Sequence, residues 1–171
     1  MQHRQWFDTI KAFKRAAVLC AALPIAVQAA LAQGRVIYPD PSVAKTQIRQ
    51  ALERARTQHK RVILDFGGNW CGDCLVLDIY FHDPANKSLL EENFELVDVN
   101  IGRYDANQDI ADHYGIPLKR GVPALVVLSS DGKVLMAQKN REFEKMSTLQ
   151  SSDVTRFLND WKPTHRGARG R

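Results

Sequence analysis

The sequence predicts a three-layer α/β fold in which a mixed central β-sheet is flanked by helices. Short apolar segments of strand type alternate along the chain with segments whose apolar residues recur at helical spacing. Helical segments separate the first two strands, which favours parallel pairing, whereas a short turn joins the last two, which favours antiparallel pairing. The length of 171 residues, 44% of them hydrophobic, suits one domain with a substantial core.

The first helix and the first strand are expected between residues 39 and 66. From Pro39 to Lys60 the apolar residues recur at helical spacing, and Ser42 is placed to cap the helix N-terminus. The run Val62–Phe66 is short, apolar and followed by two glycines, which is typical of a buried strand.

The middle of the chain predicts three helices and a second strand. A helix is expected to begin near Cys71 and to end at about residue 81, because the Asp-Pro pair at 83–84 interrupts the helical pattern. A shorter helix is expected over 88–93, a strand over 95–101, and a further helix over 107–114, which Gly and Pro residues close.

The last third of the chain predicts a hairpin followed by a helix. Two apolar strands, 124–128 and 134–137, are joined through Ser-Asp-Gly-Lys at 130–133, a typical hairpin turn. A final amphipathic helix is expected over 152–161, and the basic residues 163–171 are expected to form a flexible tail.

The charge distribution argues against binding to nucleic acid. The chain has a net charge of +5, but residues 1–32 and 162–171 carry four Lys or Arg each. The 129 residues between them hold 16 basic and 18 acidic residues, so the body of the protein is slightly acidic. No nucleic-acid partner is expected.

The first 32 residues have the pattern of a secretory signal peptide. Basic residues up to Arg15 precede an apolar stretch over 16–26, and small residues follow, ending in Ala30-Leu31-Ala32. We expect cleavage after Ala32 or after Ala29, a folded domain over 33–162 and a periplasmic location. The alternative is an uncleaved anchor to the inner membrane formed by residues 16–32, although a spanning helix needs about 20 apolar residues.

Removal of the signal would leave two cysteines, Cys71 and Cys74, in an oxidising compartment. A disulfide between them would close too short a loop to stabilise the fold substantially. Two cysteines three residues apart on a helix share one face, and the helix N-terminus stabilises the thiolate of the first. We expect Cys71 to be the exposed nucleophile and Cys74 to resolve the mixed disulfide from one turn deeper.

A Cys-x-x-Cys pair also supplies half of many zinc sites. A tetrahedral zinc site needs two further ligands. The histidines that could provide them, His59, His82, His113 and His165, are scattered without ligand pairing. We therefore expect no metal. Since Gly67-Gly68 lacks the spacing of a phosphate-binding loop, no cofactor is expected either.

The motifs together resemble those of the thioredoxin superfamily. They are the strand Val62–Phe66, Trp-Cys-Gly-Asp-Cys at 70–74, and Gly-Val-Pro-Ala at 121–124. The chain looks most like the exported thioredoxin-like domains of bacterial thiol:disulfide interchange proteins. The resemblance implies a thioredoxin-like fold for the domain at 33–162, with Cys71 as nucleophile and Cys74 as resolving thiol.

The resemblance also implies a substrate-binding surface around the cysteines. Pro123 matches the family's cis-proline, and the preceding Val122 would present its backbone to the substrate chain. Trp70 matches the active-site tryptophan. Gly72 and Asp73, between the cysteines, complete the expected substrate contacts, and the negative charge of Asp73 should disfavour the Cys71 thiolate.

Asp65 is the third expected catalytic residue. It lies six positions before Cys71, where many thioredoxins carry a buried aspartate. A carboxylate in an apolar strand loses hydration, so its pKa should rise and it can accept the proton of Cys74 near neutral pH. The alternative is a solvated, structural aspartate at a strand end. Asp98 stands where thioredoxins often have a lysine, so Asp65 is expected to face a second carboxylate.

These features predict an exported thiol:disulfide oxidoreductase, a monomer that reduces disulfides of client proteins through a Cys-Gly-Asp-Cys cycle. Its expected partners are those clients and an upstream thiol:disulfide electron donor or acceptor. The alternatives are a disulfide oxidase or isomerase, or a non-catalytic binding or assembly factor with this fold. The residues 117–120, Pro-Leu-Lys-Arg, lengthen the loop before Pro123 and are expected to reshape the substrate groove.

Overall fold

The computed structural model describes residues 36–139, 143 and 148–164. The sheet has four strands, β1 (Arg61–Gly67), β2 (Phe94–Asn100), β3 (Ala124–Leu128) and β4 (Val134–Ala137). Their order across the sheet is β2-β1-β3-β4. β1 pairs with β2 in parallel and with β3 antiparallel, and β3 pairs with β4 antiparallel, so the prediction of a mixed sheet is confirmed. The segment interpreted as a signal peptide lies outside the described residues, as do 165–171 of the expected tail.

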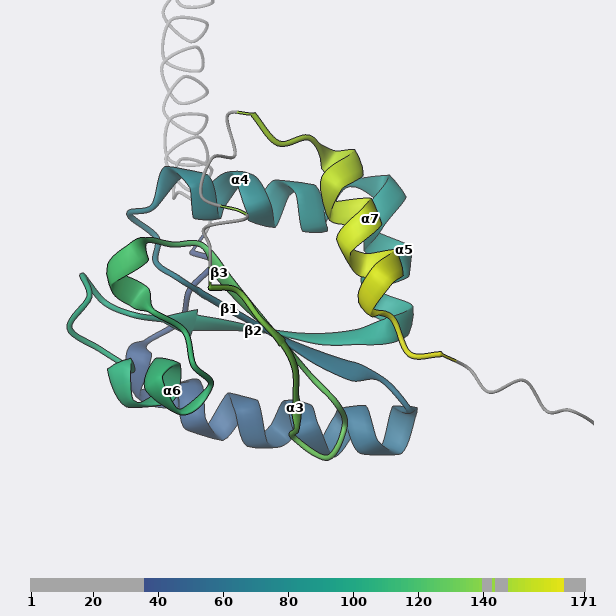
Figure 1. Ribbon diagram of the computed structural model, residues 1–171, viewed down its shortest axis with the longest axis horizontal. Helices are drawn as coiled ribbons and strands as arrows, with labels where there is room; N and C mark the ends of the chain where they lie inside the picture. Colours follow the sequence, from purple (N-terminus) through teal and green to yellow (C-terminus); the bar gives the residue numbers. More distant parts are fainter. Residues whose placement is uncertain (1–35, 140–142, 144–147, 165–171) are drawn as a thin grey trace, which may run out of the picture. The chain divides into compact units, whose positions relative to one another are not determined.

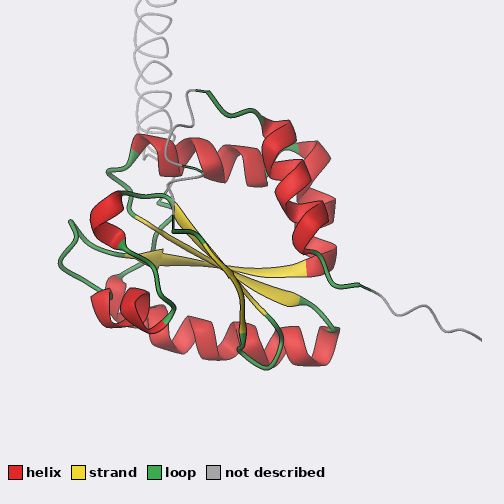
Figure 2. Cartoon of the chain, viewed as in Figure 1, coloured by secondary structure: helices red, strands yellow, loops and turns green. Residues whose placement is uncertain are grey.

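Helices cover both faces of the sheet (Figures 1 and 2). One face packs against α3 (Ala44–Gln58) and α6 (Gln108–His113). The other packs against α4 (Gly72–Phe81), α5 (Pro84–Asn93) and α7 (Ser151–Trp161). The three-layer prediction is confirmed, and the two faces carry separate hydrophobic clusters.

The alternation of side chains along β1 explains why this strand reads as a continuous apolar run. Val62, Leu64 and Phe66 belong to the cluster under α3, whereas Ile63 belongs to the cluster under α4, α5 and α7. Because β1 is a central strand, both sets are buried. Asp65 lies two residues after Ile63 and therefore on the same side of the strand. Its carboxyl thus points toward the face of the sheet that α4 covers.

Two helices begin elsewhere than the sequence predicts. Ser42 does not cap α3. It lies in the 3₁₀ turn η2 (Pro41–Val43), where its backbone N–H and its hydroxyl both donate to Asp40 Oδ1. α5 begins at Pro84 rather than at residue 88, because Asp83 caps it and a proline is well accommodated at the first helical position. The Asp-Pro pair thus ends α4 and starts α5.

A buried asparagine joins α5 to α7. The Asn86 side-chain amide donates to the carbonyl oxygens of Tyr80 and Ser151 at 2.9 and 3.1 Å, and its oxygen accepts from the Thr155 hydroxyl at 2.6 Å. Ser151 also donates to the α5 cap Asp83. These bonds give the buried Asn86 side chain its partners and connect the start of α5 to the start of α7.

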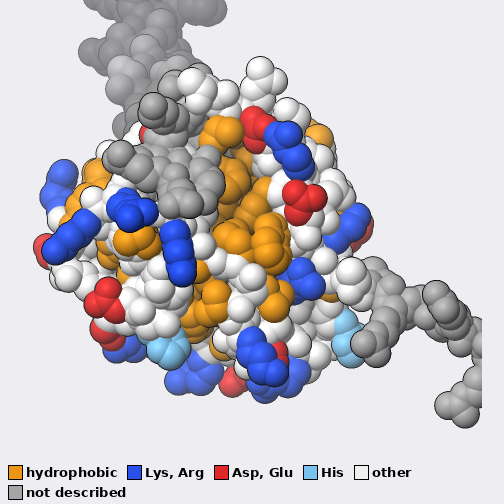
Figure 3. Space-filling view, in the orientation of Figure 1, with side chains coloured by type: hydrophobic (Ala, Val, Ile, Leu, Met, Phe, Trp, Pro, Cys, Tyr) orange, Lys and Arg blue, Asp and Glu red, His pale blue; other side chains and the backbone are white. Residues whose placement is uncertain are grey.

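The surface carries both charged and apolar side chains. Figure 3 shows hydrophobic side chains across the middle of one face, with Lys and Arg side chains around them. The edge strand β4 exposes Val134 and Leu135. None of the helices in the described part of the chain is both long and apolar enough to cross a lipid bilayer.

Candidate active site

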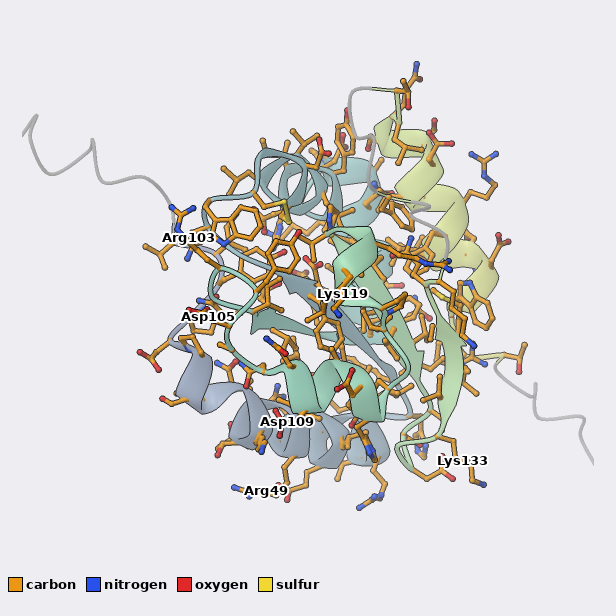
Figure 4. All side chains as sticks on the ribbon, turned by 60° about the vertical axis from the view of Figure 1, so that its left-hand side comes forward. Arg49, Arg103, Asp105, Asp109, Lys119 and Lys133 are labelled. Atoms are coloured by element: carbon orange, nitrogen blue, oxygen red, sulfur yellow. A yellow bond between two sulfur atoms is a disulfide. The ribbon has the colours of Figure 1, made fainter. Side chains whose placement is uncertain are left out.

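Cys71 and Cys74 form a disulfide at the N-terminus of α4, where Figure 4 shows the paired sulfur atoms. Cys71 is the residue that caps the helix, and Cys74 lies in its first turn. The backbone N–H of Cys74 donates to Cys71 Sγ at 3.1 Å. This N–H is one of the amides that a helix N-terminus leaves without a backbone partner, and it would stabilise negative charge on the Cys71 sulfur.

The two cysteines differ in depth less than the sequence predicts. Cys74 is fully buried, and Cys71 is 6% exposed rather than openly accessible. The expectation of a freely exposed Cys71 is therefore wrong, although Cys71 is the more accessible of the two. Val122, itself buried, is one of the residues against Cys71, with its carbonyl oxygen 3.7 Å from Cys71 Sγ.

Val122 and Pro123 lie beside the disulfide, as the resemblance implies. The peptide bond between them is cis. Gly72 and Asp73 form the first turn of α4, with Gly72 exposed and Asp73 half-buried. The structure therefore brings Val122 next to the nucleophile and places Gly72 on the surface.

Trp70 is held by the loop that follows β2. Its indole N–H donates to the carbonyl of Gly102, and its ring packs at a tilt against Tyr104 with centroids 5.4 Å apart. The Arg103 guanidinium lies 6.0 Å from the centre of the indole, and Figure 4 shows Arg103 on this loop. Since 40% of Trp70 remains exposed, it offers an aromatic surface beside Cys71.

A cleft of about 610 Å³ lies next to Tyr104, the ring that packs against Trp70. Tyr104 forms one of its walls, and residues 116–119 form another. The lengthened loop predicted at 117–120 contains the 3₁₀ turn η3 (Leu118–Arg120), which Arg120 anchors by donating to the carbonyl of Lys139. Residues 117–119 thus form part of the wall of a cleft that begins at Tyr104, the ring that packs against Trp70.

Asp65 is a buried carboxyl, 1% exposed, and not the solvated aspartate of the alternative interpretation. Burial raises the pKa of Asp65 well above its ordinary value, and the nearby carboxylate of Asp98 raises it further. The β1–β2 register pairs Asp65 with Asp98, so the expected second carboxylate is present. A hydrogen bond from Tyr38 acts in the opposite direction and lowers the pKa.

Tyr38 and Asn69 are site residues that the sequence analysis missed. The Tyr38 hydroxyl donates to Asp65 Oδ2 at 2.7 Å, and Asn69 holds the Tyr38 backbone from the loop before Trp70. Neither belongs to a motif. The only available signal was weak: Tyr38 is the single Phe, Trp or Tyr between residues 33 and 60.

The described residues contain no group of three or more His, Cys, Asp and Glu side chains arranged to hold a metal ion. Their chemistry at this site consists of a dithiol that can close to a disulfide, a buried carboxyl of raised pKa and a tyrosine hydroxyl that donates to this carboxyl. This set of groups supports thiol–disulfide exchange.

Comparison with known proteins agrees with this chemistry. The family model described as Thioredoxin-like matches residues 43–130. The chain is 32% identical over 99 residues to a thioredoxin of Mycoplasmoides gallisepticum, a match that covers 58% of this chain and 87% of the relative. It is 30% identical over 112 residues to the thiol:disulfide interchange protein DsbD of Photorhabdus laumondii, covering 63% of this chain and 17% of that protein.

Among solved structures, a disulphide isomerase from Xylella fastidiosa Temecula1 is 33% identical to this chain. The two structures agree with a TM-score of 0.70, over 74% of this chain and 96% of the other. The similarity therefore extends over nearly the whole of that protein.

Proposed function

Since the chain belongs to the thioredoxin-like family and is a thiol:disulfide oxidoreductase of that fold, we propose that it reduces disulfide bonds in exported client proteins. The observation that carries this proposal is the placement of Cys71 Sγ. It receives the Cys74 amide at the start of α4 and lies beside the Val122 carbonyl. A reduced Cys71 there is stabilised as a thiolate and stands next to a backbone to which an extended client segment can bind.

The proposed reaction has two exchange steps. The Cys71 thiolate attacks one sulfur of the client disulfide, so that a Cys71–client disulfide forms and the other client sulfur leaves as a thiolate. The Cys74 thiolate then attacks Cys71 Sγ, which releases the second client thiol and forms the Cys71–Cys74 disulfide of the structure. The client gains two electrons, and an upstream dithiol must return two electrons to the pair.

Client binding is proposed to involve the surface around Cys71. Val122 supplies backbone groups next to Pro123, Gly72 leaves the approach to the sulfur open, and Asp73 sets the local charge. Trp70 and the cleft beyond Tyr104 provide apolar area for client side chains. Asp65 is proposed as the final acceptor of the Cys74 proton.

Isomerase activity is a second candidate, which the likeness to the Xylella disulphide isomerase favours. An isomerase breaks and re-forms client disulfides without net reduction, and its dithiol operates at a less reducing potential. Asp73 argues against this direction, because a carboxylate near Cys71 disfavours the thiolate, destabilises the reduced pair and so makes the dithiol more reducing.

Export is proposed from the leader pattern of residues 1–32, with the periplasm as destination and a membrane anchor over 16–32 as the alternative. The match to a thiol:disulfide interchange protein supports a setting in which disulfides are exchanged between proteins. The residues from 163 onward are proposed as a basic tail.

The deciding experiment combines an activity assay with a potential measurement. Reduction of insulin by dithiothreitol should accelerate with the wild-type protein and not with Cys71→Ser. Equilibration with glutathione should give a potential near the thioredoxin value of about −270 mV for a reductase, whereas about −180 mV or higher would identify an isomerase or oxidase. A pair that does not equilibrate with glutathione would point to a binding factor.

A further inference from the structure

Tyr38 is a buried tyrosine whose hydroxyl lies within the active site, although its backbone lies outside every motif. The side chain is 1% exposed, and the hydroxyl donates to Asp65 Oδ2 at 2.7 Å. This hydroxyl retains lone pairs that can accept a second hydrogen bond. The role of the Tyr38 hydroxyl therefore depends on which other polar groups lie near it.

Contacts at Gly67 show that the Tyr38 hydroxyl lies near Cys74. A Cβ atom added to Gly67 would lie 2.4 Å from Tyr38 Oη and 2.8 Å from Cys74 Sγ. The oxygen and the sulfur therefore flank one point, and their separation cannot exceed those two distances together. No side chain fills this point, because residue 67 is glycine. The Tyr38 hydroxyl thus contacts the Asp65 carboxyl and lies close to the resolving sulfur.

The position of Tyr38 is fixed by the loop that leads into the cysteines. Asn69 Oδ1 accepts from the backbone N–H groups of Ile37 and Tyr38 at 2.9 and 3.1 Å, and its amide donates to the Tyr38 carbonyl at 2.8 Å. Asn100, at the end of β2, donates to the next carbonyl along, that of Pro39, at 2.7 Å. The chain before α3 is therefore tied to the active-site loop.

We propose that Tyr38 relays the proton of Cys74 to Asp65 during the resolving step. As Cys74 attacks Cys71, its thiol proton passes to Tyr38 Oη while the hydroxyl proton passes to Asp65 Oδ2. The Cys71–client disulfide breaks in the same step, so the products are the Cys71–Cys74 disulfide, a client thiolate, a neutral tyrosine and a protonated Asp65. No other reactant is consumed. The inference rests on the proposed exchange cycle and names the path of its proton.

The charges around Tyr38 require it to stay neutral throughout. The ionisable groups that act on it are Asp65 of β1, Asp98 of β2 and Asp78 of α4, all of them acids. Burial and these carboxylates raise the pKa of Tyr38, which makes a tyrosinate unfavourable. The hydroxyl must therefore give up one proton as it receives another.

Substitution of Tyr38 by Phe distinguishes the relay from direct transfer to Asp65. The variant keeps the ring and removes the hydroxyl. It also removes the hydrogen bond that lowers the pKa of Asp65, so Asp65 becomes the stronger base. At a pH where Asp65 is ionised in both proteins, direct transfer to Asp65 would make resolution in Tyr38→Phe as fast as in the wild type or faster. The relay predicts slower resolution.

Stopped-flow reaction of the reduced protein with 5,5′-dithiobis(2-nitrobenzoate) separates the two steps. Attack by Cys71 releases a first thionitrobenzoate, and attack by Cys74 on the mixed disulfide releases a second. We expect Tyr38→Phe to slow the second phase about tenfold near neutral pH, below the usual 10²–10⁴-fold range of general-base effects because water also accepts the proton. The first phase should change less than about twofold.

The matched control is Tyr80→Phe, which removes a hydroxyl that donates to the Leu149 carbonyl at 3.2 Å in the cluster with α7. Both phases should keep wild-type rates. In a double substitution, Asp65→Asn should add little to the effect of Tyr38→Phe, because both interrupt one path. The slow phase in Tyr38→Phe should also lose the pH dependence that Asp65 gives the wild type.

A measurement on the wild type tests the relay without depending on whether the variants fold. In mixtures of H₂O and D₂O, a plot of the second-phase rate against the fraction of deuterium should be curved, because two protons move in the same step. A linear dependence, or a second phase unchanged in Tyr38→Phe, would overturn the relay. Failure of the exchange cycle itself looks different, because the wild type would then show no intramolecular second phase.

Discussion

Replacing Asp65 by Asn should change how the stability of the protein depends on pH. The Asp65 carboxyl is buried, accepts one hydrogen bond from Tyr38 and faces Asp98, so its pKa in the folded protein lies well above the unfolded value of about 3.9. A raised pKa means that the folded state holds this proton more tightly. The resulting stability is fully present below about pH 3.9 and is lost as pH rises through the folded pKa.

The magnitude follows from the single proton involved. Between the two pKa values the folded state binds one proton more than the unfolded state, so the free energy of unfolding falls by about 1.4 kcal/mol per pH unit. The amide of the Asp65→Asn variant cannot titrate, and this decline disappears. A buried amide N–H without a partner costs about 1–3 kcal/mol at every pH. At acidic pH the variant should therefore have a lower free energy of unfolding than the wild type, and this deficit should shrink as pH rises.

Urea unfolding of both oxidised proteins at intervals from about pH 4 to 9 measures the two curves. Their difference should change with a slope of about 1.4 kcal/mol per unit from the acidic end upward, then level off above the folded pKa. Asp98→Asn provides a second check, since loss of that carboxylate lowers the pKa of Asp65 and should move the levelling point to lower pH. If the free energy of unfolding depended on pH in the same way for the wild type and Asp65→Asn, Asp65 would not bind its proton more tightly in the folded protein, and the reasoning would be refuted.

Other predictions concern the cysteines, export and the α5–α7 contact. Cys74→Ser should trap covalent client complexes through Cys71 on non-reducing gels, whereas Cys71→Ser should trap almost none; equal trapping would contradict the assigned order. Intact mass of the periplasmic protein should give Gln33 or Ala30 as its first residue, and Met1 retained in membranes would establish the anchor instead. Asn86→Ala should lower the free energy of unfolding by about 2–3 kcal/mol in urea, because it removes the hydrogen bonds that the buried side-chain amide makes to Tyr80, Ser151 and Thr155. A loss below about 0.5 kcal/mol would show that water replaces the amide.

The strands were predictable because their signals are local. The run Val62–Phe66 is short and apolar, and the turn at 130–133 has the composition of a hairpin. Helix starts were harder, since proline both ends one helix and begins another. Pro84 was interpreted only as a helix end, so α5 was expected four residues too late.

The site was predictable where it depends on spacing. Cys71 and Cys74 were recognisable from their separation, and Asp65 from its place in an apolar strand. Tyr38 was not, because its role depends on a contact with a residue 27 positions away that no periodicity records. The burial of Cys71 was not predictable from spacing either, since contacts such as that with Val122 join residues 51 positions apart.

The attachment of residues 37–39 to Asn69 and Asn100 has a consequence for defining the smallest working fragment. The family match begins at residue 43, so a protein trimmed to that boundary would lack Tyr38. Tyr38 is among the largest fully buried side chains, and emptying such a site typically costs about 3–5 kcal/mol, a large share of the roughly 5–15 kcal/mol that holds an ordinary domain folded. A fragment beginning at Val36 keeps this side chain, whereas one beginning at Val43 exposes the underside of the active-site loop to water.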